Sequence, residues 1–482
     1  MQKSVVAAVL AAGQGTRMKS DLLKVLHGVS GQPMVEYVVE AARAAGVTEV
    51  ITVVGYQAER VQGVLGDRTR YALQDRQLGT GHAVMQTKSL LEGQTGHLLV
   101  LYGDNPLLRP ETIRGLINRH LSSGAAATTL TAIMPDPTGL GRILRDEQGR
   151  YLRTVEEKDA TPAQKAIQEA MSGIFCFQMP LIFDLLARLK TDNVQGEYYL
   201  TDVLRLLVED GQPVEIEVAA DWRDVIGPND RRQLAQAEAI MRERILDRLM
   251  AEGVSVIDPA STFVQARVQV GQDTVLHPFT FLEGSTVIGR GCQVGPSARL
   301  VDSQLEDGVT VTESVVESSV IRSGARVGPF SHLRAQSDIG PEAEIGNFAE
   351  TKAARIGARV KAHHHSYLGD VTIGAEANIG AGVVTVNYDG ADKHHTFIGK
   401  KAFLGCNVNL IAPLEVGDGA YVAAGSTVNQ AVPADALAIA RARQVNKEGY
   451  AARLRATLEG RKAARLSKQG ERLAGTPGVG EK

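Results

Sequence analysis

Two glycines and two cations follow the first apolar run of the chain. The segment Leu10-Ala11-Ala12-Gly13-Gln14-Gly15-Thr16-Arg17-Met18 is followed shortly by Lys24. Glycines let backbone N–H groups approach a nucleotide closely, and the cations can neutralise a triphosphate. The third glycine of the dinucleotide fingerprint is absent. The loop therefore predicts phosphate binding of another kind, whereas a solvated surface lysine is the alternative for Lys24.

An aspartate follows another apolar run. The run Leu98–Tyr102 ends in Gly103-Asp104. A carboxylate at the end of a buried strand is costly unless it meets a cation. Asp104 is therefore a candidate partner for a bound cation, and a turn-capping aspartate is the alternative.

Three adjacent histidines, His363, His364 and His365, suggest a metal site at first sight. Adjacent residues of a strand point to alternate faces, so only two of the three could converge on one ion.

Alternating apolar and amphipathic segments must position the residues of the first half. Val5–Leu10, Val50–Val54 and Leu98–Tyr102 are apolar runs, and Pro33–Ala45 carries apolar residues at helical spacing. Such an alternation indicates a parallel sheet covered on both faces. We therefore expect a doubly wound, Rossmann-like α/β domain over residues 1–229, with its ligand at the carboxyl ends of the strands.

The period changes from about Val254. An aliphatic residue followed by glycine recurs, often in steps of six, as at Ile288-Gly289 and Val294-Gly295. This is the hexapeptide repeat of a parallel β-helix, in which each unit forms one side of a triangular coil. The narrow interior accounts for 50 glycines and only 5% aromatic residues. The repeat breaks between Ile379 and Ile398, so residues 386–393 are expected to loop out, where function often lies.

Two helical segments complete the organisation. Residues 230–252 show helical spacing of apolar residues and predict one helix that links the two domains. The β-helix is expected over residues 253–441. Residues 442–482 are expected to form a basic helical tail, helical over Tyr450–Leu466, and Gly475–Lys482 has the composition of a disordered end.

The bulk composition argues against several classes of protein. A net charge of -3 with mixed signs does not favour a nucleic-acid partner. No apolar run approaches the 18 residues that a membrane span needs. Three cysteines without a pairing pattern fit a reducing cytoplasm.

These motifs together resemble the bacterial bifunctional family that makes UDP-N-acetylglucosamine, the precursor of peptidoglycan and lipopolysaccharide. The first loop matches the pattern LAAGxGTRM…K, Gln74–Ala83 matches QxxQLGTGHA, and Gly346–Lys352 resembles GNFVEMKK. The resemblance covers about residues 4–450. It implies a nucleotidyltransferase domain followed by a left-handed parallel β-helix, a homotrimer with active sites between subunits, Mg²⁺ as cofactor, and UTP and acetyl-CoA as substrates.

In the first domain the resemblance implies transfer of UMP from UTP to N-acetylglucosamine 1-phosphate. Arg17 and Lys24 would neutralise charge, and Asp104 and Asn229 would hold Mg²⁺. Gln74 would pair with the uracil edge, which offers both a donor and an acceptor to an amide. The full set of implied nucleotide and sugar contacts is Leu10, Ala11, Ala12, Gly13, Lys24, Gln74, Gly79, Thr80, Tyr102, Gly103, Asp104, Gly141, Glu156 and Asn229.

One position departs from the family pattern. Met171 stands where the family has an asparagine that contacts the amino sugar. Loss of one neutral hydrogen bond is worth about 0.5–1.5 kcal/mol, which can weaken sugar binding or shift specificity without abolishing the reaction.

In the β-helix the resemblance implies acetylation of glucosamine 1-phosphate by acetyl-CoA. His364 would be the general base and Glu350 would orient it, while His363 and His365 are interpreted as non-catalytic. The implied contacts to the sugar phosphate are Arg334, Lys352, Tyr367, Asn378 and Lys393. Those to acetyl-CoA are Ala381, Asn387, Tyr388, Cys406, Ala424 and Arg441. Cys406 replaces a common serine, which makes thiol reactivity a further expectation.

Two alternatives differ in class. One is an adenylyl- or thymidylyltransferase with a β-helix appendage, against which Gln74 argues. The other is a β-helix that only trimerises the enzyme and no longer acetylates. The presence of the set His364, Glu350, Lys352, Arg334 and Asn387 argues against it, and an assay of coenzyme A release would decide.

Overall fold

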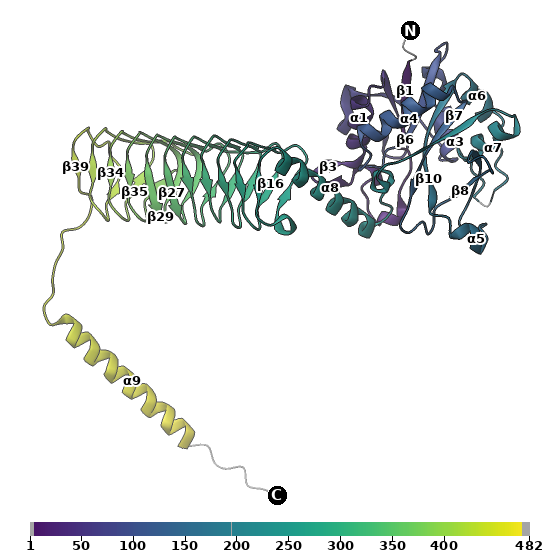
Figure 1. The fold of residues 1–482 in the computed structure, drawn as a ribbon. Coiled ribbons are helices and arrows are strands. Elements are labelled where there is room, and N and C mark those ends of the chain that lie inside the picture. The colour runs from purple at the N-terminus through teal and green to yellow at the C-terminus, as the bar shows by residue number, and fades with distance from the viewer. Residues whose placement is uncertain (1–3, 194, 475–482) are drawn as a thin grey trace, which may run out of the picture.

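The computed structural model describes residues 4–193 and 195–474, and the side chains up to residue 470. The chain forms an α/β domain, a linking helix and a long β-helix, and a last helix extends away from the rod (Figure 1). The predicted tail end Gly475–Lys482 lies outside the described residues.

One mixed sheet forms the centre of the α/β domain. Its strand order is β11 (Val214–Val218), β7 (Ala127–Ile133), β10 (Glu169–Met179), β6 (Gly96–Tyr102), β1 (Val5–Leu10), β4 (Glu49–Val54) and β5 (Arg70–Leu73). β1 pairs in parallel with β4 and β6, as the apolar runs predict. β10, for which no direction was predicted, runs antiparallel between β6 and β7. An apolar run shows that a strand is buried but not in which direction it runs.

Helices cover both faces of this sheet, as expected for a doubly wound domain. Alternate residues of β1 pack to opposite sides, with Val5, Ala7 and Val9 on one side and Val6, Ala8 and Leu10 on the other. The first side carries α1 (Met34–Ala44), α2 (Ala58–Leu65) and α4 (Pro110–Ser123). The second side carries α3 (Thr80–Met85), α6 (Leu181–Leu186) and α7 (Asp202–Glu209). β8 (Arg142–Arg145) and β9 (Tyr151–Val155) form a hairpin beside β10, and α5 (Pro162–Lys165) follows it.

Helix α8 (Arg231–Ala251) joins the two domains. It begins at Asp230, whose carboxylate accepts hydrogen bonds from two backbone N–H groups of the first turn and caps the helix. Ala237 packs into a small core with residues of the α/β domain. Leu246 and Leu249 pack into the core of the β-helix instead. One helix therefore contributes apolar side chains to both bodies.

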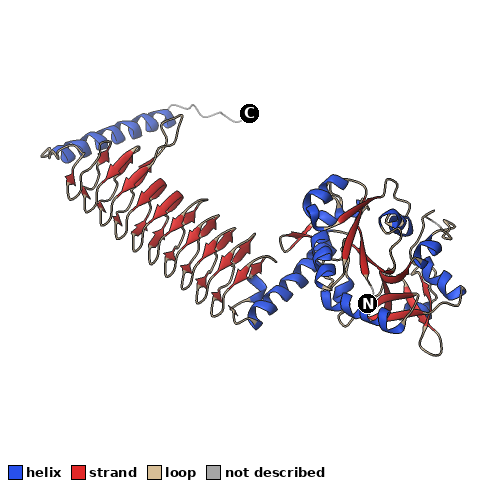
Figure 2. Ribbon diagram, turned by 90° about the horizontal axis from the view of Figure 1, so that it is seen from above, coloured by secondary structure: helices blue, strands red, loops and turns tan. Residues whose placement is uncertain are grey.

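The β-helix runs from β12 (Ser255–Val256) to β39 (Leu437–Ala438), and all its strand pairs are parallel (Figure 2). Its left-handed coils hold about 17 residues, so Glu350 pairs with Tyr367 on the next coil. Ile288 and Val294 are buried in the prism, as the hexapeptide pattern predicts. One coil is longer, because Val371 pairs with Thr396. The extra residues form the expected loop, closed by a bridge between Tyr388 and Lys393.

The final helix α9 (Tyr450–Ala474) begins where the sequence predicts and continues further. Its side chains are exposed up to residue 470. Among residues 4–193 and 195–474, no helix combines the length and the hydropathy needed to cross a bilayer.

Candidate functional site

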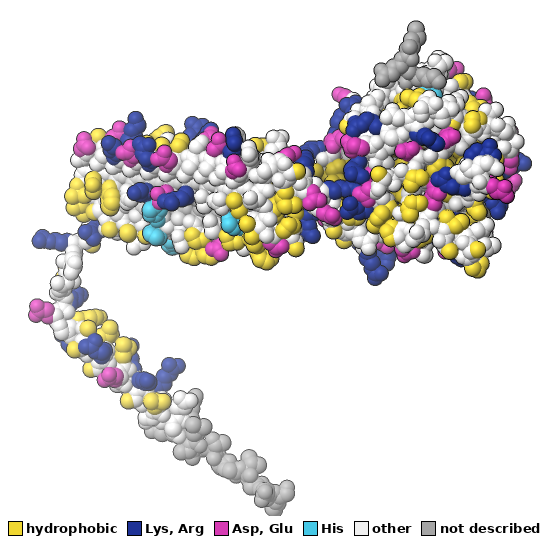
Figure 3. Space-filling view, viewed as in Figure 1, with side chains coloured by type: hydrophobic (Ala, Val, Ile, Leu, Met, Phe, Trp, Pro, Cys, Tyr) yellow, Lys and Arg dark blue, Asp and Glu magenta, His cyan; other side chains and the backbone are white. Residues whose placement is uncertain are grey.

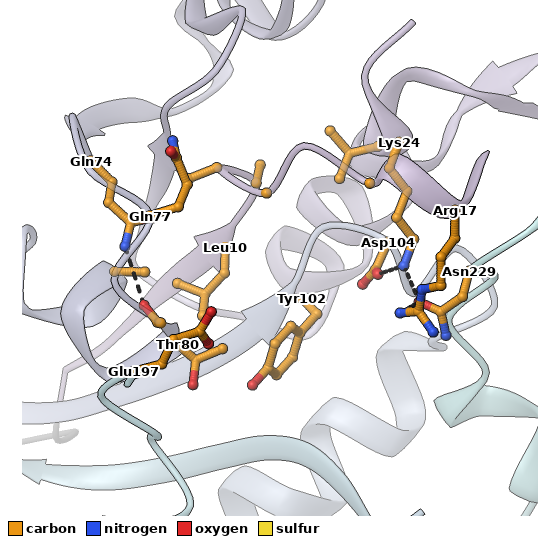
Figure 4. Close-up of a pocket in the computed structure, with 17 residues that line it drawn as sticks. Leu10, Arg17, Lys24, Gln74, Gln77, Thr80, Tyr102, Asp104, Glu197 and Asn229 are labelled. Carbon is orange, nitrogen blue, oxygen red and sulfur yellow. Dashed lines mark hydrogen bonds and ion pairs between the residues drawn. The ribbon is translucent and has the colours of Figure 1, made fainter. Parts of the chain in front are cut away.

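A cavity of about 310 Å³ lies at the carboxyl ends of β1 and β6 (Figure 4). Its lining includes Leu10, Ala11, Ala12, Gly13, Arg17, Lys24, Gln74, Gly79, Thr80, Tyr102, Asp104 and Asn229. The structure thus brings together, around one cavity, twelve residues that the sequence analysis named from four separate segments.

Three predicted residues do not line this cavity. Gly103 lies beneath it, where an added Cβ would sit 3.1 Å from the carbonyl oxygen of Leu10. Gly141 and Glu156 lie together at the β8–β9 hairpin, where an added Cβ on Gly141 would sit 3.4 Å from the Glu156 carboxylate. Their contact with a sugar stays a prediction.

Five lining residues were not named as site residues, namely Gly15, Val25, Gln77, Ala83 and Glu197. Four of them lie inside or next to the motifs already recognised. Glu197 comes from the distant segment Gly196–Asp202, which folds over the loop at residues 78–81. Tyr198 donates its N–H to Leu78 and accepts from Gly81, both at 2.8 Å. The segment 196–202 also fits the family pattern, and this fit is the sequence signal for Glu197.

Two oxygen atoms converge on one cation at the edge of the cavity. The ammonium of Lys24 forms an ion pair with Asp104 and donates to Asn229 Oδ1 at 2.6 Å. Arg17 Nη2 donates to the same Asn229 oxygen at 2.9 Å. The ammonium thus occupies a position that both oxygens can reach. A carboxylate and an amide oxygen around one cation position, open to a polar cavity, fit Mg²⁺ with further ligands from phosphate and water.

Gln74 is held in one orientation. Its side chain is almost fully buried, and its amide Nε2 lies 3.2 Å from the Gly79 carbonyl and 3.0 Å from His82 Nδ1. Both contacts use the amide nitrogen, so Oε1 is left as an acceptor. No residue of 4–193 or 195–474 donates to that oxygen. Such an acceptor matches the N3–H donor of uracil.

Tyr102 forms part of the cavity wall. Burial raises the pKa of Tyr102 to about 12, so its hydroxyl stays protonated and can donate. Its ring packs against Gly173, where an added Cβ would lie 2.8 Å from the ring and where φ is 81°. The nearby Met171 turns its sulfur toward the core, where Sδ accepts from Thr129 Oγ1 at 3.2 Å. Met171 therefore has a thioether where the family has an amide, and this thioether is already bonded to Thr129.

A second cluster of polar side chains lies on the β-helix beside the long coil. Arg334 Nη1 donates to Glu350 Oε1 at 2.9 Å. Lys352 Nζ lies 3.7 Å from Asp370 Oδ2, to which Asn387 also donates at 2.5 Å. Two further residues complete the cluster. The Tyr367 hydroxyl lies 3.5 Å from Asn387 Nδ2, and Lys393 lies beside Lys352. Figure 3 shows Lys, Arg and His side chains on the visible face of the rod.

The cations of this cluster make it a site for an anion. The neighbouring ammonium of Lys352 lowers the pKa of Lys393, and Arg334 adds to the effect. A phosphate would relieve the repulsion between these cations. Of the sugar-phosphate set named from the sequence, Arg334, Lys352, Tyr367 and Lys393 lie here, whereas Asn378 lies in β31 (Asn378–Ile379) on another face.

His364 lies at the end of β29 (Lys361–His364), at a corner of the coil before Tyr367. Within the described residues no hydrogen bond joins His364 to Glu350, whose carboxylate pairs with Arg334 instead. The orienting role of Glu350 therefore stays a prediction. His363 Nε2 bonds Glu344 Oε2 at 2.8 Å, and His365 forms the corner with φ of 42°. No group of three metal-ligating side chains occurs among residues 4–193 and 195–474.

Three of the residues predicted to contact acetyl-CoA lie on the same edge of the β-helix as His364, on the coils that follow it. The N–H of Gly382 lies 3.4 Å from the His364 carbonyl, the N–H of Asn407 donates to the Ala381 carbonyl at 2.7 Å, and that of Gly425 to the Cys406 carbonyl at 2.8 Å. Ala381, Cys406 and Ala424 therefore occupy equivalent places on successive coils. Arg441 lies next to Gly425, and Cys406 is exposed. Asn387 and Tyr388 lie apart from this edge, in the loop of the long coil.

Comparison with known proteins covers almost the whole chain. A family model described as nucleotidyl transferase matches residues 6–237. A bifunctional protein GlmU of Symbiobacterium thermophilum is 51% identical over 465 residues, which cover 96% of this chain and 99% of that protein. Those of Geobacillus sp. and Brevibacillus brevis are 49% and 50% identical over 93% and 92% of this chain, and 98% and 96% of their own lengths. The chain belongs to the family of bifunctional GlmU proteins.

Proposed function

We propose that this chain makes UDP-N-acetylglucosamine in two steps. The β-helix transfers an acetyl group from acetyl-CoA to glucosamine 1-phosphate, and the α/β domain then transfers UMP from UTP to the product and releases pyrophosphate. The observation that carries the proposal is the presence of two separate polar clusters, one in each domain, on a chain that matches bifunctional relatives over nearly its full length.

In uridylyl transfer the phosphate of the sugar attacks the α-phosphorus of UTP in line, so catalysis consists of positioning and charge neutralisation. Gln74 Oε1 accepts from the uracil and selects the base. Arg17 and Lys24 contact the phosphates. Asp104 and Asn229 would hold Mg²⁺, which would supply charge stabilisation to the phosphates. Lys24 then exchanges its ion pair with Asp104 for a phosphate oxygen.

In acetyl transfer the amine nitrogen of glucosamine 1-phosphate attacks the thioester carbon. His364 accepts the proton that the nitrogen loses, the C–S bond breaks, and coenzyme A leaves. Arg334, Lys352 and Lys393 bind the sugar phosphate. Ala381, Cys406 and Ala424 form the edge along which acetyl-CoA lies, since only small or slender side chains leave room for the cofactor chain there.

The working form is a homotrimer in the cytoplasm. Aromatic side chains are exposed along the β-helix, including Phe348 at 61% and Tyr421 at 55%. Such exposed apolar side chains favour burial between subunits. Asn387 and the His364 edge lie on different parts of one chain, which supports an acetyltransferase site completed by a second subunit. A monomeric mass in light scattering would contradict this part of the proposal.

A coupled assay with glucosamine 1-phosphate, acetyl-CoA, UTP and Mg²⁺ tests both halves. Intact protein should form UDP-N-acetylglucosamine, and His364→Ala should form it only from N-acetylglucosamine 1-phosphate. Lys24→Met is the complementary variant, expected to release coenzyme A normally and to make little nucleotide sugar. If intact protein uses only the acetylated sugar, the β-helix is a scaffold and the acetyltransferase assignment is wrong.

A further inference from the structure

A short hairpin lies where the α/β domain, helix α8 and the β-helix meet (Figure 1). It consists of β2 (Gly28–Val29), a two-residue turn, and β3 (Gln32–Pro33). The turn residue Ser30 is 4% exposed and has φ of 44°. Ser30 donates its backbone N–H to Glu238 Oε2 at 2.5 Å and its hydroxyl to Glu238 Oε1 at 3.1 Å. Its carbonyl accepts from the N–H of Ala266 in the β-helix at 3.0 Å.

The hydrogen bonds that Ser30 donates to Glu238 have a charged acceptor. Glu238 lies in helix α8, and no lysine, arginine or histidine within the described ranges forms a salt bridge with it. Its carboxylate is therefore satisfied by the two donors of Ser30. Hydrogen bonds to an ionised group are shorter and stronger than those between neutral groups. This contact therefore fixes the hairpin along the axis of α8.

The hairpin is attached directly to Lys24. The short helix η2 (Lys24–Leu26) leads into it, and the His27 carbonyl accepts from the N–H of Met34 at 3.1 Å, which closes its base. Val29 packs in a small core with Met34 and Ala237 of α8. A shift of the hairpin along α8 would therefore move Lys24 as well.

The same helix fixes Asn229. Asn229 directly precedes the capping residue Asp230, and its N–H donates to Gln233 Oε1 at 2.7 Å. The first turn of α8 thus holds Asn229, and a later turn of the same helix holds the hairpin through Glu238. The 2.6 Å contact between Lys24 and Asn229 joins the two ends of this arrangement.

We propose that Glu238 is a positioning residue for uridylyl transfer, because by holding Ser30 it sets where Lys24 lies relative to Asn229. The inference rests on the proposed function of the first site. If Glu238 merely attached the two domains to each other, its loss would lower stability and leave the chemistry of the folded enzyme intact. If it positions Lys24, its loss changes uridylyl transfer in folded protein and leaves acetyl transfer unchanged.

The test compares Glu238→Ala with Glu243→Ala in full-length protein. Glu243 is a matched control, since it lies in the same helix and bonds Arg223 of the α/β domain at 3.3 Å. Glu238→Ala should lower kcat for uridylyl transfer by about 10- to 100-fold, the effect of misplacing a catalytic group by about 1 Å. Its KM for UTP should change less than kcat. Binding of Mn²⁺ with UTP, followed by the electron paramagnetic resonance of free Mn²⁺, should weaken as well.

Two smaller changes grade the effect. Glu238→Gln keeps one acceptor oxygen for the two donors of Ser30 and should give an intermediate loss. Ser30→Gly removes only the hydroxyl bond, and glycine accepts the positive φ, so it should give the smallest loss. The rate of acetyl transfer and the thermal unfolding midpoint check in each case that the protein is folded.

Each outcome has a distinct meaning. If folded Glu238→Ala keeps the kcat of the intact chain and its Mn²⁺ binding, the inference is wrong and the proposed function stands. If intact protein transfers no uridylyl group, the proposed function fails and the inference fails with it. Should Glu238→Ala not fold, unchanged kcat in both Glu238→Gln and Ser30→Gly would overturn the inference.

Discussion

The replacement of Gly15 by alanine tests how the nucleotide loop holds Lys24. Gly15 has φ of 67°, in the left-handed region, where an alanine costs about 1–2 kcal/mol. An added Cβ would overlap Cβ of Lys24, far inside the 3.4–4 Å of ordinary contact. Because this neighbour is Cβ of Lys24 and not the far end of a flexible side chain, the backbone segment that carries Lys24 must shift by about 1 Å.

The expected consequence is a loss of catalysis in one half of the enzyme only. A displacement of that size lowers kcat for uridylyl transfer by about 100-fold. Initial rates of pyrophosphate release at saturating UTP and N-acetylglucosamine 1-phosphate measure it. Gly63→Ala is the matched control, because φ of Gly63 is ordinary and no atom lies within 4 Å of the added Cβ. It should leave both activities unchanged.

Acetyl transfer in the same Gly15→Ala preparation reports whether the protein is intact, since the β-helix does not contact Gly15. Full acetyl transfer with uridylyl kcat reduced 100-fold supports the reasoning. Uridylyl kcat within threefold of the intact protein would refute it, because the loop would then accommodate the methyl group without moving Lys24.

Three further predictions concern other parts of the chain. Asp224 is fully buried and accepts hydrogen bonds from Arg109 and Arg244. Asp224→Ala should therefore lower the free energy of unfolding by about 3–5 kcal/mol. Urea unfolding followed by the fluorescence of the only tryptophan, Trp222, measures this change, and a change below about 1 kcal/mol would contradict the prediction. The pKa of Lys393 is lowered from the value of an ordinary lysine, which is about 10.4, so its ammonium loses its proton at a lower pH. As the pH is raised, KM for glucosamine 1-phosphate should therefore begin to rise below the pH at which an ordinary lysine titrates. Lys393→Arg should remove that rise, and identical pH profiles would count against it. Cys406 is the exposed thiol, so iodoacetamide should modify it first and acetyl-CoA should slow the reaction; equal rates with and without acetyl-CoA would place Cys406 outside the groove.

Much of the fold follows from periodicity in the sequence. The run Val5–Leu10 coincides with β1, and the break in the hexapeptide repeat coincides with the loop before β33 (Thr396–Ile398). In both cases burial dictates the pattern, since the interior of a sheet or a narrow prism admits few residue types. The direction of β10 was not predictable, because an antiparallel strand buried on both faces has the same apolar run as a parallel one.

The site residues were predictable where they belong to one continuous motif, and less so where residues distant in the sequence come together in the fold. The family resemblance implies that Asp104 and Asn229 share one metal site, but only the fold shows that both contact the ammonium of Lys24. Glu197 escaped notice as a site residue because its segment folds over the nucleotide loop from a distance. The pairing of Glu350 with Arg334 depends on which residues of stacked coils become neighbours, and coils of 16 to 18 residues leave that register open.

The rod between the two clusters determines how the intermediate travels. Residues 254–366 of the β-helix separate the junction from the His364 edge, and with about 17 residues per coil and about 4.8 Å per coil this is about 30 Å of solid prism. Its interior is packed with aliphatic side chains and offers no internal passage for a charged sugar. On the proposed function, N-acetylglucosamine 1-phosphate made at one end reaches the other by diffusion through the surrounding solution. It mixes there with the free pool, so each half of the enzyme responds to the bulk concentration of this sugar rather than to the turnover of the other half.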